Sequence, residues 1–341
     1  MGLFSAIYGL GLFCKKYADT RLRRPDRLPA KVISIGNITL GGTGKTPAVI
    51  SLAREAKKRG LKPCVLTRGY KGKTKETCFV SKGEGPLLTA KEAGDEALLM
   101  AEQLKGIPVV KGSDRFRAGV FAMENDQLSI ISLQHPTTFI LDDGFQHWKL
   151  HRDVDVLLVD ATKPFGNGKL FPEGIMREPF SALGRADIIV ITKSDMAPSG
   201  AVTEITRRIR PHNAEAPVFT ATHQPSGLIT VSGSRTGLET LKNKKIYAFA
   251  AIANPSHFRS VLASAGAEVV GLRKFRDHYV YNQKDIDQIT KDAAGLDMIT
   301  TEKDLVKLRD LRLPEKLFAL SIEFSVENDF YEHIFNMINR T

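Results

Sequence analysis

One glycine-rich segment, residues 34–47, limits more than any other what this chain can fold into. It reads Ser-Ile-Gly-Asn-Ile-Thr-Leu-Gly-Gly-Thr-Gly-Lys-Thr-Pro and begins inside a short apolar run at 31–35. We expect a buried strand at 31–35, a tight turn, and a helix over 47–58 with proline in its first turn. Such a turn lets successive backbone N–H groups surround phosphate oxygens at the start of a helix. The segment therefore predicts a phosphate-binding loop in an α/β domain.

The residues after the glycines indicate a nucleotide with a metal ion. Lys45 can reach the β- and γ-phosphates, and the hydroxyl of Thr46 can bind Mg²⁺. The strict pattern G-x-x-x-x-G-K-[ST] is not met, because its first position holds Thr39. The alternative is a plain glycine-rich turn that joins a strand to a helix. Gly-Lys-Thr placed between a strand and a helix favours the phosphate loop.

A pair of acids supplies a second sign of phosphate chemistry. The apolar run 139–141 ends in Asp142 and Asp143, where a phosphate-loop enzyme needs a carboxylate for its metal. A helix N-cap would explain the pair nearly as well if it stood alone. After a phosphate loop in the same domain, the metal-binding interpretation is favoured.

Two other motifs give weaker signals. His147 and His151 have the spacing of a zinc pair, but no obvious third ligand accompanies them, so we expect no zinc site. Thr-Lys-Ser-Asp at 192–195 is similar to the base-reading motif of GTPases, although the Asn of that motif is missing. A phosphate-loop GTPase or other regulatory nucleotide switch therefore remains the alternative function.

Short apolar runs alternate with helical patterns along the chain. Unalternating β-branched runs between helices indicate a parallel sheet covered on both faces. We expect further strands at 63–67, 107–110, 138–141, 154–159, 188–191, 245–251, 267–272 and 298–300. We expect further helices over 90–105, from Asn254-Pro255 onward, and over 328–339.

The predicted fold class is α/β, with a phosphate-loop NTPase-like parallel sheet domain and a second, smaller α/β domain. The length of 341 residues fits about two domains. The expected division is an N-terminal interfacial helix with a basic collar (1–28), an ATP-binding kinase domain (29–198), a smaller α/β domain that closes the cleft (199–325) and a C-terminal helix (326–341).

The positive charge of the chain is concentrated at its beginning. The net charge is +11, yet residues 1–75 hold 17 Lys and Arg against three acids and alone carry +14. Residues 1–14 are uncharged and rich in large apolar side chains, and six Lys and Arg residues follow within 15–27. This charge order is the reverse of a secretory signal. A short apolar helix with a basic collar fits the interface of an anionic membrane, and a helix packed on the protein's own core is the alternative.

Other functional classes are excluded or unnecessary. No run of 18 apolar residues exists, so the length argument for a membrane-spanning helix fails. The three cysteines have no metal-ligand spacing and indicate a reduced cytosolic setting. A nucleic acid is not needed to explain the charge, because phosphates of a nucleotide and of lipid headgroups would suffice.

Eight short motifs occur together in an order typical of one enzyme family. After the glycine-rich segment come Thr-Arg-Gly-Tyr (67–70), Gly-Asp-Glu-Ala (94–97), Asp-Asp-Gly-Phe-Gln-His (142–147), Arg-Asp-Val-Asp (152–155), Met-Arg-Glu-Pro (176–179), Phe-Arg-Asp-His (275–278) and Thr-Glu-Lys-Asp (301–304). Together they resemble the tetraacyldisaccharide 4′-kinases, the lipid A kinases of Gram-negative bacteria. The matches span about residues 30–305, and Thr39 in the loop is also that family's form.

The resemblance implies a reaction and a location. The γ-phosphate of ATP would pass to the 4′-hydroxyl of a tetraacylated glucosamine disaccharide 1-phosphate, giving lipid IVA, with ATP and Mg²⁺ as cofactors. The partners would be this acylated lipid and an anionic membrane surface at the cytoplasmic face of the bacterial inner membrane. We expect a monomer and no nucleic-acid partner.

The resemblance also implies a set of site residues. Lys45 would act on the phosphates, and Asp95 with His278 would form the acid–imidazole pair near the acceptor hydroxyl, with the proton acceptor of the two left open. The other implied residues are Thr39, Leu40, Gly41, Gly42, Thr43, Gly44 and Thr46 for ATP; Thr46, Asp142, Asp143 and Glu178 for the metal; and Asn37, Arg68, Tyr70, Gln146, His147 and Arg177 for the substrate. Since Asp95 and His278 belong to different predicted domains, closure of the cleft would assemble the pair.

Overall fold

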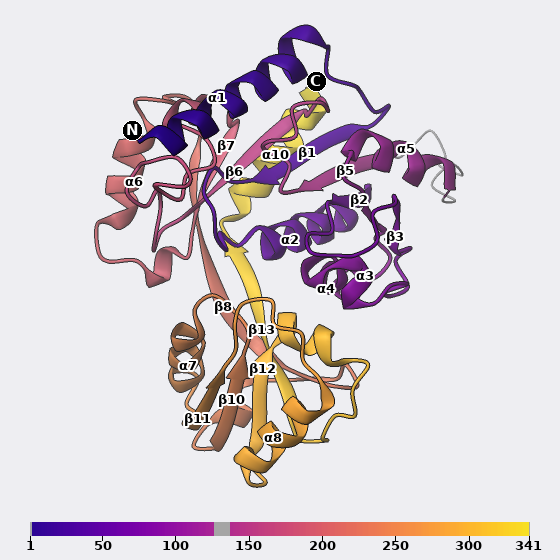
Figure 1. Ribbon diagram of the computed structural model, residues 1–341, viewed down its shortest axis with the longest axis vertical. Coiled ribbons are helices and arrows are strands. Elements are labelled where there is room, and N and C mark those ends of the chain that lie inside the picture. The colour runs from indigo at the N-terminus through magenta and orange to yellow at the C-terminus, as the bar shows by residue number, and fades with distance from the viewer. Residues whose placement is uncertain (1, 126–136, 341) are drawn as a thin grey trace.

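The computed structural model of the chain describes residues 2–125 and 137–340. The first residue of the predicted interfacial segment, Met1, and the last residue of the predicted C-terminal segment, Thr341, lie outside the described residues. The described strands form one 13-stranded sheet in the order β11-β10-β12-β13-β8-β7-β6-β1-β5-β2-β4-β3, with β9 beside β8 (Figure 1). Most neighbours are parallel, and the antiparallel pairs are β3–β4, β8–β13 and β8–β9. The predicted α/β class is therefore confirmed.

The strands have the following bounds: β1 Lys31–Gly36, β2 Lys62–Thr67, β3 Cys78–Ser81, β4 Val109–Lys111, β5 Thr137–Asp142, β6 Val154–Asp160, β7 Ile188–Thr192, β8 Val218–Thr230, β9 Arg235–Thr236, β10 Lys245–Ala250, β11 Glu268–Lys274, β12 Asp297–Thr301 and β13 Leu317–Val326. The α-helices have these bounds: α1 Leu3–Tyr17, α2 Lys45–Lys58, α3 Ala90–Ala93, α4 Asp95–Gln103, α5 Arg115–Asn125, α6 Ala201–Ile209, α7 Pro255–Ser264, α8 Gln283–Ala293, α9 Glu302–Leu305 and α10 Asn328–Arg340. Shorter helical turns are η1 Ala18–Leu22, η3 Phe180–Arg185, η4 Ser194–Met196, η5 Leu238–Leu241 and η6 Val306–Leu308.

The helix predicted over 90–105 is wrong in one respect, because Gly94 divides it. Gly94 has φ 90° and is both the last cap of α3 and the first cap of α4. A side chain at this position would overlap the carbonyl oxygen of Tyr70, so only glycine fits here. The break starts a new helix at Asp95 and places that carboxylate in its first turn.

The sheet has two halves, each with its own apolar packing. In the upper half of Figure 1, helices α2, α4 and α10 cover one face of β1, β5 and β6, and α5 covers the other face of β1, β2 and β5. In the lower half, α7 and α8 lie on opposite faces of β10 and β12. The long strands β8 and β13 run through both halves and contribute side chains to both cores.

Strand β13 carries the chain back from the lower half to the upper half. Helix α10 then packs there, and its Tyr331 hydroxyl lies 2.6 Å from the Ser51 hydroxyl of α2. The two halves are thus joined by paired strands rather than by a loose linker. The proposed division at residues 198 and 325 stays a prediction.

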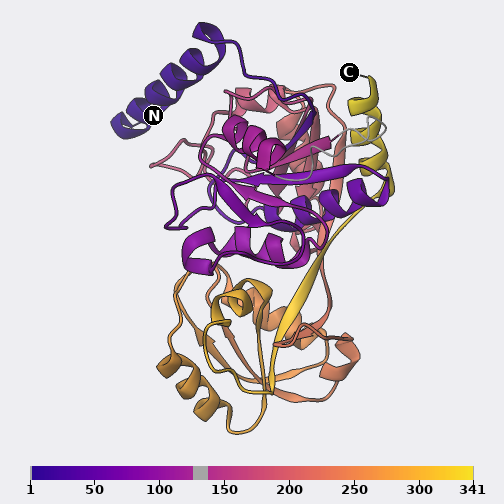
Figure 2. The same ribbon diagram turned by 90° about the vertical axis from the view of Figure 1, so that its right-hand side faces the viewer.

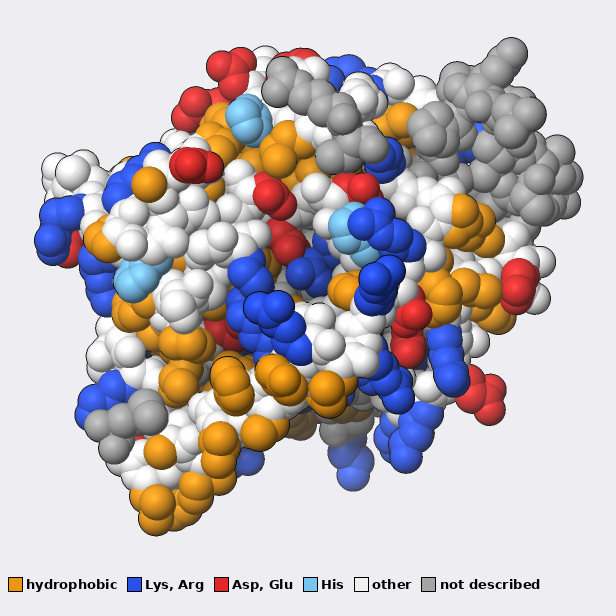
Figure 3. Space-filling view, turned by 90° about the horizontal axis from the view of Figure 1, so that it is seen from above, with side chains coloured by type: hydrophobic (Ala, Val, Ile, Leu, Met, Phe, Trp, Pro, Cys, Tyr) orange, Lys and Arg blue, Asp and Glu red, His pale blue; other side chains and the backbone are white. Residues whose placement is uncertain are grey.

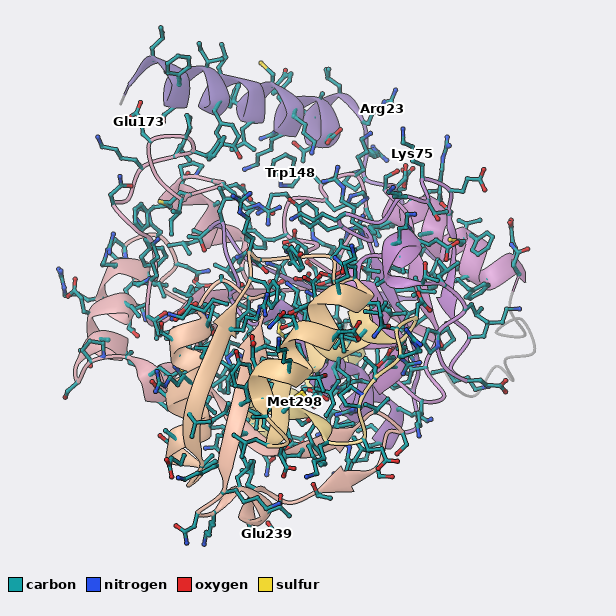
Figure 4. All side chains as sticks on the ribbon, turned by 60° about the horizontal axis from the view of Figure 1, so that its bottom comes forward. Arg23, Lys75, Trp148, Glu173, Glu239 and Met298 are labelled. Atoms are coloured by element: carbon teal, nitrogen blue, oxygen red, sulfur yellow. The ribbon has the colours of Figure 1, made fainter. Side chains whose placement is uncertain are left out.

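Helix α1 lies along the outside of the upper half, away from the sheet (Figure 2). The Ser5 hydroxyl donates a 2.8 Å hydrogen bond to the Leu170 carbonyl, and the Tyr8 hydroxyl donates one of 3.2 Å to the Arg177 carbonyl. Figure 4 shows Trp148 below this helix and Glu173 beside its start. Across the described residues, no helix has the length and apolar character needed to cross a membrane.

Candidate active site

The glycine-rich loop connects the carboxyl end of β1 to α2, as predicted. Helix α2 begins at Lys45, and its cap Gly44 has φ 83°, a left-handed conformation that glycine adopts readily. A side chain on Gly44 would also overlap the ring of His223 from β8. Burial lowers the pKa of His223 to about 4, so a neutral imidazole backs the loop.

The residues predicted at positions 39–46 therefore sit where a phosphate would meet the helix N-terminus. Thr39, Thr43 and Thr46 are buried, whereas Leu40 is exposed at 46%. Gly41 has φ 118° and open space around it. The threonines of the loop are therefore packed against the protein, whereas Leu40 and Gly41 face open space.

Lys193, which sequence reasoning had considered only as part of a base-reading motif, fixes this loop from outside. Its Nζ donates a 2.6 Å hydrogen bond to the Gly42 carbonyl and forms an ion pair with Asp160. The neighbouring Thr192 hydroxyl donates a 3.0 Å hydrogen bond to the Thr43 carbonyl. The 192–195 motif therefore supports the phosphate loop from the end of β7.

Lys45 and three other polar side chains form a cluster beside the loop. Lys45 Nζ lies 3.4 Å from Asn37 Oδ1 and 3.8 Å from Asp143 Oδ1. The Arg177 guanidinium donates hydrogen bonds to the same Asn37 oxygen at 3.2 Å and to Asp143 at 2.8 Å. Burial would raise the pKa of Asp143, but Lys45 and Arg177 outweigh it and hold that pKa below its usual value. The resemblance assigned Lys45 to the phosphates, Asp143 to the metal, and Asn37 and Arg177 to the substrate, and the structure brings the four together.

Asp142 has a different environment from its neighbour. Its Oδ2 accepts a 2.8 Å hydrogen bond from the Thr67 hydroxyl, while Oδ1 is buried with no hydrogen-bond partner within the described residues. Burial, with the nearby charges of Glu96 and Asp143, raises the pKa of Asp142 to about 6. A buried carboxylate oxygen without a partner is the chemical condition that a bound cation would relieve.

Glu178, the third predicted metal-binding acid, is engaged elsewhere. The Arg185 guanidinium donates 2.8 Å and 2.9 Å hydrogen bonds to its two oxygens, and Gln146 donates one of 2.7 Å. Within residues 2–125 and 137–340, no group of three or more His, Cys, Asp or Glu side chains is arranged to hold a metal. Magnesium commonly needs only one or two carboxylates besides phosphate and water, so Asp142 and Thr46 remain suitable ligands.

The predicted acid–imidazole pair is assembled across the two halves. Asp95 lies at the start of α4 in the upper half, and His278 lies in the loop after β11 in the lower half. His278 Nδ1 lies 3.0 Å from Asp95 Oδ2, with only 16% and 14% of the two side chains exposed. The ring of Tyr70 stands edge-on to His278 with centroids 6.0 Å apart, and is itself 63% exposed.

The remaining predicted substrate residues differ in their settings. Arg68 is exposed, as a residue that contacts a ligand from solvent would be. His147 Nε2 accepts a 3.3 Å hydrogen bond from the backbone N–H of Arg115. Burial, with Arg115 adding to it, lowers the pKa of His147 to about 4. His147 is therefore a neutral acceptor at physiological pH rather than a cation.

Arg115 is a buried residue of this region that sequence reasoning missed. Its guanidinium donates hydrogen bonds to the carbonyls of Gly112 at 2.9 Å and of Asp142 at 3.3 Å. A signal existed, since Gly-Ser-Asp-Arg at 112–115 directly follows a predicted parallel strand, where site residues gather. Seen from above, as in Figure 3, the molecule has acidic and basic side chains gathered around a hollow.

Comparisons with known proteins agree with this geometry. A family model described as "LpxK: Tetraacyldisaccharide-1-P 4'-kinase" matches residues 1–339. The tetraacyldisaccharide 4′-kinase of Syntrophus aciditrophicus (strain SB) is 40% identical, covering 97% of this chain and 90% of that protein. The enzyme of the same name from Halothermothrix orenii is 36% identical, covering 96% of this chain and 88% of that one.

A solved structure is also similar over nearly the whole chain. It is the crystal structure of LpxK from Aquifex aeolicus in complex with ATP, with a TM-score of 0.80 and 32% sequence identity. The likeness covers 99% of this chain and 96% of that one. The fold is therefore shared with a protein whose structure was solved in complex with ATP.

Proposed function

The chain belongs to the tetraacyldisaccharide-1-P 4′-kinase family, and from this we propose that it transfers the γ-phosphate of ATP to the 4′-hydroxyl of a tetraacyldisaccharide 1-phosphate. The product would be lipid IVA, an intermediate of lipid A biosynthesis. The observation that carries the proposal is the pairing of Asp95 with His278 in the same molecule as a complete phosphate loop.

The phosphate loop and its neighbours would hold ATP. Backbone N–H groups of residues 39–46 face the phosphates, and Lys45 brings its ammonium to the β- and γ-phosphates. Asn37 and Asp143 hold the Lys45 side chain, since both lie near its Nζ and Arg177 donates hydrogen bonds to both of them. The cation is thus aligned before the nucleotide arrives, which favours transfer through positioning.

A magnesium ion fits the residues beside the loop. Asp142 offers a buried, unpartnered oxygen, and the Thr46 hydroxyl lies in the first turn of α2. When bound, Mg²⁺ supplies charge neutralisation on the phosphoryl group. Asp143 is tied to Arg177 and Glu178 to Arg185, so we propose Asp142 as the direct carboxylate ligand, with the other two ordering its surroundings.

The acid–imidazole pair would activate the acceptor. A sugar hydroxyl is a poor nucleophile, and a positioned carboxylate or imidazole can take its proton as the bond to phosphorus forms. Asp95 and His278 are mostly shielded from water and touch each other, so either can accept the proton while the other stabilises the charge that results. Tyr70 and Arg68 at the exposed border would contact the disaccharide 1-phosphate.

Helix α1 would bring the enzyme to its lipid. Its exposed large apolar side chains are Leu3, Phe4, Ile7, Leu10, Phe13 and Tyr17, each between 50% and 73% exposed. In the view from above, Figure 3 shows hydrophobic side chains in a band along one edge of the molecule, with Lys and Arg side chains nearby. An apolar surface beside cations is suited to an anionic membrane interface. We place the protein as a monomer at the cytoplasmic face of the inner membrane, with no nucleic acid involved.

A direct assay tests the proposal. Purified protein is incubated with Mg²⁺, ATP labelled at its γ-phosphate and tetraacyldisaccharide 1-phosphate in mixed micelles. We expect label in a lipid that carries two phosphates. An acceptor lacking the 4′-hydroxyl serves as the control. Absence of labelled lipid from folded, ATP-binding protein would overturn the proposed reaction.

A nucleotide competition tests the alternative of a GTPase switch. Lys193 contacts the phosphate loop as the lysine of a base-reading motif would, but its side chain is already engaged by Gly42 and Asp160. We expect unlabelled ATP, and not GTP, to displace labelled ATP. Equal displacement by GTP would favour the switch.

A further inference from the structure

Helix α4 is held along its length by the lower half of the molecule. Five side-chain pairs cross this contact: Asp95–His278 at 3.0 Å, Asp95–Lys307 at 3.9 Å, Glu96–Lys303 at 3.7 Å, Glu102–Arg309 at 2.5 Å and Gln103–Glu302 at 2.6 Å. Four of the five pair an acid of α4 with a Lys, Arg or His of the lower half. The Asp95–His278 pair is therefore one member of a row of charge contacts.

Lys307 is the most enclosed cation of this row. Its side chain is 4% exposed, compared with 20% for Lys303 and 55% for Arg309. Its Nζ lies 2.6 Å from Asp304 Oδ1 and 3.9 Å from Asp95 Oδ2, so it stands between two carboxylates. A cation so placed cannot be replaced by water without exposing the two negative charges to each other.

The lower half positions Lys307 independently of Asp95. Asp304 is fully buried, and its Oδ2 accepts hydrogen bonds of 2.9 Å from the Ala251 N–H and 2.8 Å from the Thr301 hydroxyl. Lys307 follows Asp304 by one helical turn and also lies 5.3 Å from the centre of the Tyr281 ring. All these partners belong to the lower half, so contacts other than the one with Asp95 also hold the ammonium of Lys307 in place.

Lys303 contacts a different set of groups from Lys307. Its Nζ lies 3.7 Å from Glu96, 3.5 Å from Asp277 and 3.5 Å from His278 Nε2. His278 Nε2 also lies 3.8 Å from Asp277. The groups around Asp95 are thus His278 and Lys307, with Lys303, Glu96, Asp277, Asp304 and Tyr281 behind them. Among the described residues of this contact, Lys307 and His278 are the two basic side chains that lie within 4 Å of Asp95.

We propose that Lys307 is a positioning residue for phosphoryl transfer, which holds the Asp95 carboxylate turned toward His278. The inference rests on the proposed function, in which that pair acts at the acceptor hydroxyl. Without Lys307, the Asp95 carboxylate would lose the ammonium that lies 3.9 Å from its Oδ2 and attracts its negative charge to this position. A carboxylate that has turned away from His278 can no longer act together with the imidazole at the acceptor hydroxyl.

Three variants separate positioning from simple support of the fold. Lys307→Met removes the ammonium but leaves Asp304 buried without its cation, and that could unfold the lower half. The double variant Lys307→Met with Asp304→Asn removes both charges and keeps an amide oxygen for Ala251 and Thr301. Lys307→Arg keeps a cation. Arg309→Met is the matched control, because it breaks another ion pair of α4 within the same contact.

The kinetic parameters of each variant are measured between about pH 5 and pH 9 with ATP and the lipid acceptor. We expect the double variant to fold, to keep its KM for ATP, and to lose kcat by about tenfold or more. The acidic limb of its kcat/KM profile should move to higher pH, because the carboxylate has lost its cation. Lys307→Arg should restore most of kcat, and Arg309→Met should leave the pH profile unchanged.

Two results would overturn the inference and not the proposed function. One is a double variant with the kcat and pH profile of the unmodified protein, which would make Lys307 only a partner for Asp304. The other is a pH shift of the same size in Arg309→Met. Failure of the proposed function has a different result, which is the absence of labelled lipid when the unmodified protein folds and binds ATP.

Discussion

His278 Nδ1 lies 3.0 Å from Asp95 Oδ2, although 183 positions separate the two residues in the chain. Asp95 is fixed by the glycine break before α4, and His278 is held in a left-handed conformation with φ 62°. A non-glycine residue in that conformation usually marks local strain that the surrounding structure maintains. The pair therefore depends on both halves being in this arrangement.

The first prediction concerns this pair. Asp95→Asn and His278→Asn should each lower kcat by about 10²- to 10⁴-fold, since each removes one member of an acid–base unit. The double variant should be no slower than the slower single variant, because residues that act as a unit are not additive. Transfer rates under single-turnover conditions check this. Multiplicative losses would show that the two side chains act separately.

The second prediction concerns the phosphate loop. Lys45→Ala should reduce phosphoryl transfer by at least about 100-fold, because the ammonium that would reach the β- and γ-phosphates is lost. Lys58→Ala is the matched control, since that lysine ends the same helix with a side chain 81% exposed. Circular dichroism should show that both variants fold. Equal activity of the two would contradict the assignment of Lys45.

The sequence indicated the loop, the acid pair and the positions of most strands of the upper half because these depend on local patterns. The apolar run 31–35 became β1, and helix α2 begins two residues before the predicted start. The continuity of the sheet through β8 and β13 was not visible in the same way, because pairing between strands about 90 positions apart leaves no local periodicity.

The site shows the same limit. Asp142 and Asp143 are adjacent and were treated as equivalent, yet one is tied to Arg177 and the other has a free buried oxygen. Only the fold decides which side of the strand end each carboxylate faces. Glu178 likewise could be known as an Arg185 partner only after η3 was placed.

The third prediction concerns the metal. Removal of divalent cations with EDTA should abolish transfer, and added Mg²⁺ should restore it. Asp142→Asn should need a higher Mg²⁺ concentration for half-maximal rate, because its buried oxygen would no longer carry the charge of a carboxylate. Glu178→Gln is the comparison, since Arg185 already occupies that carboxylate. A Mg²⁺ requirement raised more by Glu178→Gln would reverse the two roles.

The fourth prediction concerns pH and stability. Burial lowers the pKa of His147 to about 4 from its usual value of 6.5, so the folded protein keeps this ring neutral while the unfolded chain takes up a proton. Its contribution to stability is therefore complete above about pH 6.5 and falls as the pH drops toward 4. Up to about 2 kcal/mol should be lost between pH 7 and pH 5.

His147→Gln tests this value, because an amide oxygen can accept the Arg115 N–H and does not titrate. Urea unfolding at the two pH values should show a smaller loss for the variant than for the unmodified protein. Identical losses would mean that other groups, such as the buried His223, set the acid sensitivity.

The last prediction concerns membrane binding by α1. Leu10 is 64% exposed on this helix, and Leu10→Glu places a charge where the acyl boundary would lie. We expect the variant to sediment less with vesicles of anionic lipid and to show a higher KM for the lipid acceptor, with ATP binding unchanged. Val280→Glu is the matched control, because Val280 is 82% exposed but lies in the lower half, far along the chain from α1. It should bind vesicles normally. Equal sedimentation of both variants would leave α1 as a helix that only packs on its own protein through Ser5 and Tyr8.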